Sequence, residues 1–214
     1  MAHMLSIGIE QNAPAMALAA KRLGVRKTFP KGVEIFRQDE EADLVYGLTS
    51  GTVRTTRVLG DGRRQIGNFY HCGDLIGLAT GPLHHFSAET LAECTFLVVK
   101  RSSILPHSGD HELDSALWEA MRRELERTQE HLLFLGRTTA CERVAKFLMN
   151  IATQNSNARV ALPMNRQDMA DYLGLTIETV SRTVSHLQAL EVVEFTGWRH
   201  FRVVRWDALE RLAA

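Results

Sequence analysis

Two runs of periodically spaced apolar residues near the C-terminus predict a pair of helices joined by a tight turn. The first run, over residues 165–173, carries its apolar residues on one side: Met169, Ala170 and Leu173. Asn165 precedes Asp168 by three residues, a spacing typical of a capped helix N-terminus. Gly174 then suits the left-handed backbone of a corner. The pattern predicts a helix-turn-helix.

The second run, over residues 176–188, predicts a helix with two different faces. Thr176 can cap this helix. Its apolar residues follow at helical spacing: Ile177, Val180, Val184 and Leu187. The opposite stripe is polar: Glu178, Ser181, Arg182 and Ser185.

The polar stripe has the chemistry of a surface that reads a DNA major groove. An acid accepts a hydrogen bond from cytosine, a guanidinium grips guanine, and a small hydroxyl fits beside thymine. We expect base contacts from Glu178, Ser181 and Arg182. Contacts to the DNA backbone are expected from Thr176, Thr179 and Ser185. The alternative is an ordinary surface helix near the end of a domain.

Residues 111–136 are rich in helix formers and predict one long helix. Apolar and small residues recur along it at alternating spacings of three and four: Trp118, Met121, Leu125, Thr128, Leu132 and Leu135. This spacing is typical of a coiled-coil seam and predicts the interface of a homodimer. The alternative is a helix packed on its own domain. Gly136 is expected to form a hinge before a further helix, which carries Val144, Phe147, Leu148 and Ile151.

The remaining segments predict strands. Between Val25 and Arg101, short β-like runs alternate with turn signals such as Gly60-Asp61-Gly62, which indicates an antiparallel sandwich or barrel. Residues 5–24 predict a helix over it. Residues 192–206 contain two β-rich runs around Thr196-Gly197, which predicts a two-stranded wing. Basic residues on or beside the wing are placed to hold phosphates, although a charged, solvated strand edge explains them equally well: Arg199, His200, Arg202 and Arg205.

These elements together predict an α+β protein with three parts, at residues 5–110, 111–136 and 137–214. The chain has 214 residues, 45% hydrophobic and 23% charged, as in soluble globular proteins. It contains no secretory segment and no apolar run near the about 18 residues that span a bilayer, so we expect a cytoplasmic protein without membrane contact.

Charge and cysteine content narrow the chemistry further. The formal net charge is zero, and residues 137–214 hold ten Lys/Arg against eight Asp/Glu. Affinity for phosphate must therefore come from local clusters and from doubling in a dimer. The three cysteines, Cys72, Cys94 and Cys141, form no CxxC pair, so they indicate small buried residues and no metal site.

The succession of motifs resembles the CRP/FNR superfamily of bacterial transcription regulators. The β-like segment is similar to their β-roll, which has the fold of cyclic-nucleotide-binding domains, and the long helix and helix-turn-helix follow in the same order. The resemblance covers nearly the whole chain from about Val25. It implies an N-terminal β-roll, a dimerisation helix and a C-terminal winged helix-turn-helix.

The resemblance also implies which effectors this chain does not use. Superfamily members that bind cyclic AMP carry Glu and Arg at the positions of Leu78 and Phe86, and an apolar pocket does not offset the desolvation of a phosphate. The cysteine cluster that holds iron and sulfur in the FNR branch is absent, since the first cysteine is Cys72. We therefore expect no cofactor. An unidentified small ligand remains the alternative, or haem on His71, Cys72, His84 or His85.

Within the superfamily, Glu178-Thr179-Val180-Ser181-Arg182 resembles the E-x-x-S-R pattern of the FNR and FixK branch. That pattern implies TTGAT-like half-sites, and the missing cysteine cluster favours the FixK group, which regulates low-oxygen and nitrogen-fixation genes. The expected partners are palindromic DNA, a second copy of the chain and RNA polymerase. A different class, an enzyme or ligand-binding module with a helical tail, is disfavoured because no P-loop, HExxH, GxSxG or GxGxxG motif is present, and no catalytic residue is expected.

Overall fold

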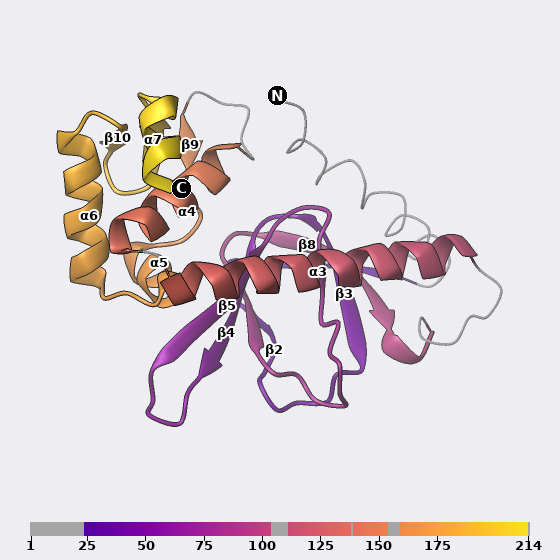
Figure 1. Cartoon of the computed structure of the whole chain (residues 1–214). Helices are drawn as coiled ribbons and strands as arrows, with labels where there is room; N and C mark the ends of the chain where they lie inside the picture. Colours follow the sequence, from indigo (N-terminus) through magenta and orange to yellow (C-terminus); the bar gives the residue numbers. More distant parts are fainter. Residues whose placement is uncertain (1–23, 104–110, 138, 154–158, 214) are drawn as a thin grey trace. The chain divides into compact units, whose positions relative to one another are not determined.

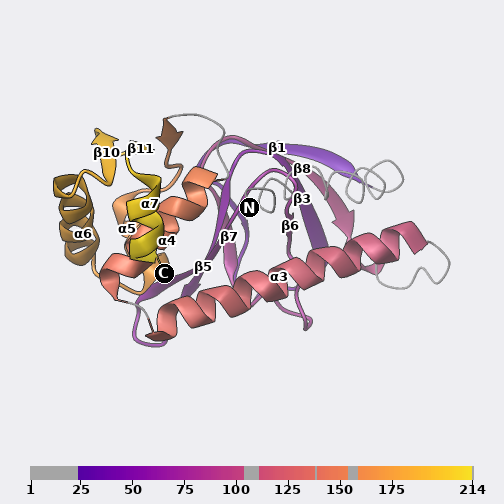
Figure 2. The same ribbon diagram turned by 45° about the horizontal axis from the view of Figure 1, so that its top comes forward.

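The computed structural model describes residues 24–103, 111–137, 139–153 and 159–213. The chain forms two compact units that divide between Arg127 and Thr128, inside one long helix. Figures 1 and 2 show the strands of the first unit and the mostly helical second unit. No helix of the described residues is both long and apolar enough to cross a membrane. The helix expected within residues 5–24 lies outside the described residues.

The first unit is built from two four-stranded antiparallel sheets, as the alternating runs predicted. One sheet has the strand order β1-β8-β3-β6 and the other β2-β7-β4-β5. The strands are β1 Val25–Phe29, β2 Glu34–Phe36, β3 Leu44–Ser50, β4 Val53–Val58, β5 Arg64–Tyr70, β6 Leu75–Ile76, β7 Ser87–Thr90 and β8 Cys94–Lys100. A short 3-10 turn, Arg101–Ser103, follows the last of them.

Alternate residues of these strands point inward and form the core of the first unit. The most deeply buried of them are Leu48, Val53, Ile66, Ala88 and Phe96. Cys94 is also fully buried, as expected, and a Cβ at Gly51 would lie 2.5 Å from its sulfur. The expectation was wrong for Cys72, which is exposed in a turn and donates its thiol hydrogen to the Thr49 carbonyl at 2.9 Å.

Helix α3, His111–Arg137, continues through Gly136, so the break before the next helix comes later than the glycine suggested. Helix α4, Ala140–Thr153, follows. Its buried residues include all four that the periodicity placed on its apolar side: Val144, Phe147, Leu148 and Ile151. The helix runs one residue past Gly136 because one glycine weakens a helix by only about 1 kcal/mol, which neighbouring turns can offset.

The second unit surrounds α4 with a helix-turn-helix, a small sheet and a terminal helix. Its elements are β9 Val160–Ala161, α5 Arg166–Leu173, α6 Ile177–Ala189, β10 Val193–Thr196, β11 His200–Val203 and α7 Trp206–Ala213. The sheet order is β10-β11-β9, so the expected wing has a third, short strand. Helix α7 corrects the expectation of a β-run through Trp206. It packs on α4 and buries Ala208 and Leu209, a tertiary contact that local β-propensity does not reveal.

Candidate nucleic-acid interface

Helix α5 begins with the cap that the sequence predicted. The Asn165 side chain accepts a hydrogen bond from the Asp168 backbone N–H at 2.8 Å, and the Asp168 carboxylate accepts one from the Asn165 N–H at 3.3 Å. Asp168 is almost fully buried, so this reciprocal box satisfies a carboxylate that water does not reach. The apolar side of the helix is buried as expected: Met169, Ala170 and Leu173.

The corner after α5 is held against the end of α3. Gly174 has φ 62°, and a Cβ there would lie 3.3 Å from the Leu135 side chain. The Arg143 guanidinium joins the two segments, because it donates to the Leu173 carbonyl at 3.0 Å and to the Leu135 carbonyl at 2.9 Å. Within the second unit, the helix-turn-helix is therefore fixed to the last turns of the long helix.

A histidine that the sequence did not single out completes this joint. The His131 ring stacks on Tyr172 at 4.3 Å, and its Nε2 hydrogen-bonds to the Tyr172 carbonyl at 2.9 Å. Because a carbonyl only accepts, Nε2 carries the proton. Burial lowers the pKa of His131, so the ring is neutral at physiological pH. Residues 131 and 172 are too far apart in sequence for any local pattern to pair them.

Helix α6 is anchored by one face. Thr176 is its N-cap and accepts a hydrogen bond from the Thr179 backbone at 3.2 Å. Val180, Val184 and Leu187 are buried as expected. Ile177 is an exception, because it is 37% exposed at the first turn, where the helix has just left the corner.

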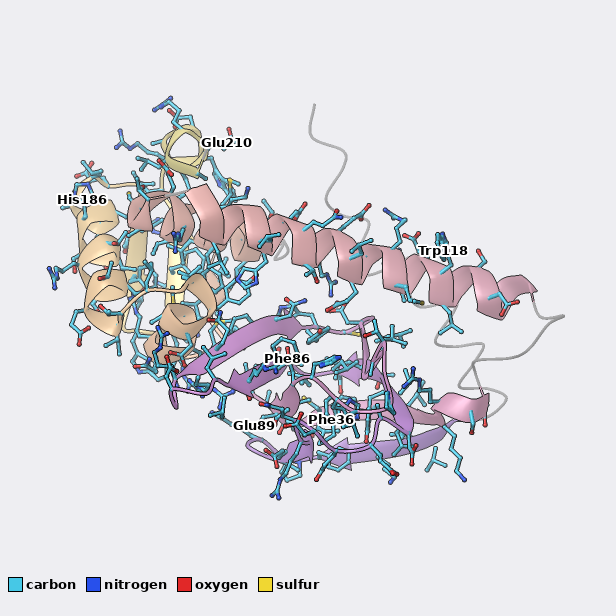
Figure 3. All side chains as sticks on the ribbon, turned by 60° about the horizontal axis from the view of Figure 1, so that its bottom comes forward. Phe36, Phe86, Glu89, Trp118, His186 and Glu210 are labelled. Carbon is cyan, nitrogen blue, oxygen red and sulfur yellow. The ribbon has the colours of Figure 1, made fainter. Side chains whose placement is uncertain are left out.

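The opposite face of α6 is open to solvent. The exposed residues are the polar ones that the periodicity grouped: Glu178, Ser181, Arg182 and Ser185. The pKa of Glu178 is lowered by hydrogen bonds from its own backbone N–H and from Thr176 and by the charge of Arg182, so it is a carboxylate at neutral pH. Thr179 is half-buried. Figure 3 shows His186, four residues beyond Arg182, projecting outward from the same helix.

The wing presents three arginines in different states. Arg202 pairs with Glu194, which lies opposite it in the β10–β11 register. Arg205 donates to the Leu190 carbonyl. Arg199 instead stacks its guanidinium on the neighbouring Trp198 ring, 4.0 Å from the centroid. His200, which opens β11, is exposed.

The long helix has one face on the β-roll and another in solvent. Leu117 packs beside Val45 and Val99, and Ala120 is buried. On the outer face the predicted seam is exposed at Trp118, Met121, Leu125, Thr128 and Leu132. Figure 3 shows Trp118 projecting from α3 on the side away from the strands. Leu135 is half-buried beside Gly174.

Polar contacts also tie α3 to the β-roll within the first unit. The Tyr70 hydroxyl donates to the Glu124 carboxylate at 2.8 Å, and Arg127 donates to Asp74 at 2.5 Å. Asp74 is buried and also accepts from the His71 backbone N–H at 2.8 Å. Burial raises the pKa of Glu124, an effect that the Tyr70 hydrogen bond and the Arg127 charge oppose.

The two apolar residues that the sequence sets against cyclic-AMP binding are packed within the first unit. Leu78 packs on the cluster of Val45 and Val99. The Phe86 ring, which is labelled in Figure 3, lies close to Gly67. A Cβ added at Gly67 would be 2.7 Å from that ring. The Arg54 side chain on β4 is largely buried and pairs with Glu89 on the adjacent strand β7 at 2.8 Å.

The candidate haem ligands lie in different environments. His84 is buried and stacks on Phe36 at 3.8 Å, and burial lowers the pKa of both His84 and His71. His85 is exposed, as is Cys72. Among the residues that the structure describes, no three His, Cys, Asp or Glu side chains are grouped so that they could hold a metal ion.

Comparison with known families assigns both units. Residues 26–106 match the cyclic nucleotide-binding domain, and residues 142–212 match the Crp-like helix-turn-helix domain. The nitrogen fixation regulation protein FixK of Azorhizobium caulinodans is 44% identical over 210 residues, which are 95% of this chain and 84% of that protein. FixK of Rhizobium meliloti is 36% identical over 97% of this chain and 94% of its own length. The solved structure of FixK2 from Bradyrhizobium japonicum has a TM-score of 0.84 at 40% identity and covers 90% of this chain and 98% of that one.

Proposed function

The chain belongs to the CRP/FNR family as a FixK-like, DNA-binding transcription regulator, and from this premise we propose that it acts as a homodimer on palindromic TTGAT-like sites. Its relatives are regulators and not enzymes. The observation that carries the proposal is the open face of α6, where a carboxylate, a guanidinium and two hydroxyls stand together on a helix whose other face is buried.

Each base-reading residue has a defined role in this proposal. Arg182 donates to O6 and N7 of the guanine in TTGAT, which is the commonest specific contact in the major groove. Glu178 accepts from N4 of the paired cytosine, a role that suits a group already ionised at neutral pH. Ser181 contacts a neighbouring thymine.

Contacts to the DNA backbone fix the register of the helix. We assign them to Thr176, Thr179, Ser185, Arg199, His200 and Arg202. The members of this set differ in whether their side chains already have partners in the structure. Arg202 shares its charge with Glu194, and Thr179 already bonds to Thr176, whereas no hydrogen bond or ion pair within the described residues engages the Arg199 side chain. Arg199 is therefore the strongest phosphate ligand of the wing.

Dimerisation supplies the second half-site. The exposed seam of α3 gives the apolar surface for a parallel helix pair, and a two-fold axis then places two copies of α6 about one DNA turn apart, roughly 34–36 Å. Doubling the contact raises affinity for a palindrome above that for a half-site.

We propose further that DNA binding needs no cyclic nucleotide. Leu78 and Phe86 offer no partner for a cyclic phosphate or a ribose hydroxyl, and the Tyr70–Glu124 and Asp74–Arg127 contacts already hold α3 on the β-roll. The named relatives are nitrogen fixation regulation proteins, so we propose nitrogen-fixation genes as targets of this chain. The family resemblance implies low-oxygen genes as further targets and RNA polymerase as the partner at the promoter.

Selection from randomised palindromes tests this function. Wild-type protein should enrich TTGAT half-sites, and Arg182→Ala should lose its preference at the G·C pair, with a loss of about 1–3 kcal/mol per contact and about 2–6 kcal/mol per dimer. Arg211→Ala is the matched control, because Arg211 is an exposed arginine of the same unit and, among the residues that the structure describes, pairs only with Asp207 on α7. If Arg182→Ala keeps full preference at the G·C pair, α6 does not read the major groove in this register.

A further inference from the structure

The turn of the wing carries a large aromatic residue in the open. Trp198 is 49% exposed in the three-residue turn between Thr196 and His200, which face each other in the register of β10 and β11. The turn itself is firmly held. Gly197 supplies the left-handed conformation with φ 66°, and the Arg199 carbonyl accepts a hydrogen bond from the Leu162 N–H at 2.7 Å.

The aromatic ring orients a cation. The Arg199 guanidinium lies 4.0 Å from the centre of the Trp198 ring, and its Nε is buried with no hydrogen-bond partner among the described residues. The indole therefore lies over one face of the guanidinium. The two terminal nitrogens form the edge that remains for a ligand, and a planar fork of this kind matches a phosphate.

We propose that Trp198 is a positioning residue for DNA binding, which holds Arg199 as a preformed phosphate clamp beside α6. This inference rests on the proposed function. Strand β10 packs against α6, so the clamp belongs to the same unit as the base-reading face. Stacking fixes the long arginine side chain before DNA arrives, so less conformational freedom is lost on binding.

The dimensions of the pair favour the phosphate backbone over the minor groove. The 4.0 Å stack, widened by half of an ordinary carbon contact on each side, is about 7.5 Å thick. A B-DNA minor groove is only about 6 Å wide, so the stacked pair does not enter it. The clamp should therefore raise affinity for every sequence and leave base preference unchanged.

The test measures DNA affinity of the full-length protein against salt concentration on a palindromic TTGAT duplex. Arg199→Ala should lower the slope of log K against log salt by about 0.9 per protomer. Trp198→Ala should weaken binding by about 2- to 5-fold per protomer, hence about 4- to 25-fold per dimer, with unchanged base preference. Trp198→Tyr, which keeps an aromatic face, should recover most of the affinity.

A double-mutant cycle separates positioning from a merely structural role. In the Arg199→Ala background, Trp198→Ala should have almost no further effect on affinity. An equal loss in both backgrounds, or no loss in either, overturns the clamp. The proposed function is judged separately: if wild-type protein fails to select a palindrome, or Arg182→Ala keeps its G·C preference, the function fails. If those two results hold while Trp198→Ala behaves as wild type, only the clamp fails.

Discussion

Replacing both Leu125 and Leu132 with glutamate should convert the protein into a monomer. These leucines lie one heptad apart on the outer face of α3 and are 58% and 71% exposed in the isolated chain. Neither contributes to the core of its own unit, so the variant should fold. The substitution acts on the proposed helix pair, where each leucine would face its counterpart in the second copy.

The size of the effect follows from these exposures. Full burial of a leucine contributes about 1.5–3 kcal/mol, and scaling by the exposed fractions of 58% and 71% gives about 2–4 kcal/mol per protomer. The dimer contains both protomers, so it loses about 4–8 kcal/mol, or about three to six powers of ten in its dissociation constant. Repulsion among four carboxylates along one seam adds to this loss.

Sedimentation equilibrium at micromolar concentration measures the change directly. The double variant should sediment as a monomer, and a gel shift should show it failing on a palindrome. Val58→Glu is the matched control, because Val58 is 61% exposed in the same unit as Leu125 but lies on β4 and not on α3. An unchanged dimer in the double variant would mean that the interface lies elsewhere, and intact palindrome binding by a true monomer would refute the need for doubling.

Two further predictions concern ligands and pH. Calorimetric titration with cyclic AMP should give no binding heat, and the purified protein should bind DNA without added ligand. A large dependence of DNA binding on cyclic AMP, or an absorbance band from haem or an iron–sulfur centre, would contradict the prediction of effector-free binding. Burial lowers the pKa of His131, so below the ordinary value of 6.5 the unfolded chain takes up a proton that the folded protein does not, and stability is lost as pH falls. The variant His131→Phe keeps a stacking ring that does not titrate. As the pH is lowered from about 7.5 to about 5.5, the melting temperature of the wild type should therefore decrease relative to that of His131→Phe. A constant difference in melting temperature would show that His131 does not titrate in this range.

The helix-turn-helix could be predicted from the sequence because its signals are local. A cap acts over three residues, as between Asn165 and Asp168, and a left-handed corner needs one glycine, Gly174. The alternating strands of the β-roll were predictable for the same reason, since the period of two is imposed by neighbouring residues. The order of the strands in the two sheets is a tertiary property, and the sequence supplied it only through the family resemblance.

The contacts that distinguish the proposed phosphate ligands from one another could not be predicted from the sequence. Arg202 and Glu194 are eight residues apart and meet only because the β10–β11 register sets them opposite each other. His131 and Tyr172 meet only because α3 and the helix-turn-helix pack together. Helix α7 forms where Trp206 ends a β-rich sequence, because packing on α4 overrides local propensity.

The two faces of α3 bear on the choice that its spacing left open. A seam of residues three and four apart is also what a helix packed on its own domain would show. In the structure, residues of α3 outside the seam contact the β-roll, through Leu117, the Tyr70–Glu124 hydrogen bond and the Asp74–Arg127 pair. Trp118 and Leu132 are both 71% exposed. Exposing these apolar side chains to water costs free energy that a monomer does not recover. The charged contacts determine which face of α3 packs on the β-roll. The exposed seam on the other face therefore supports a second copy of the helix as its partner.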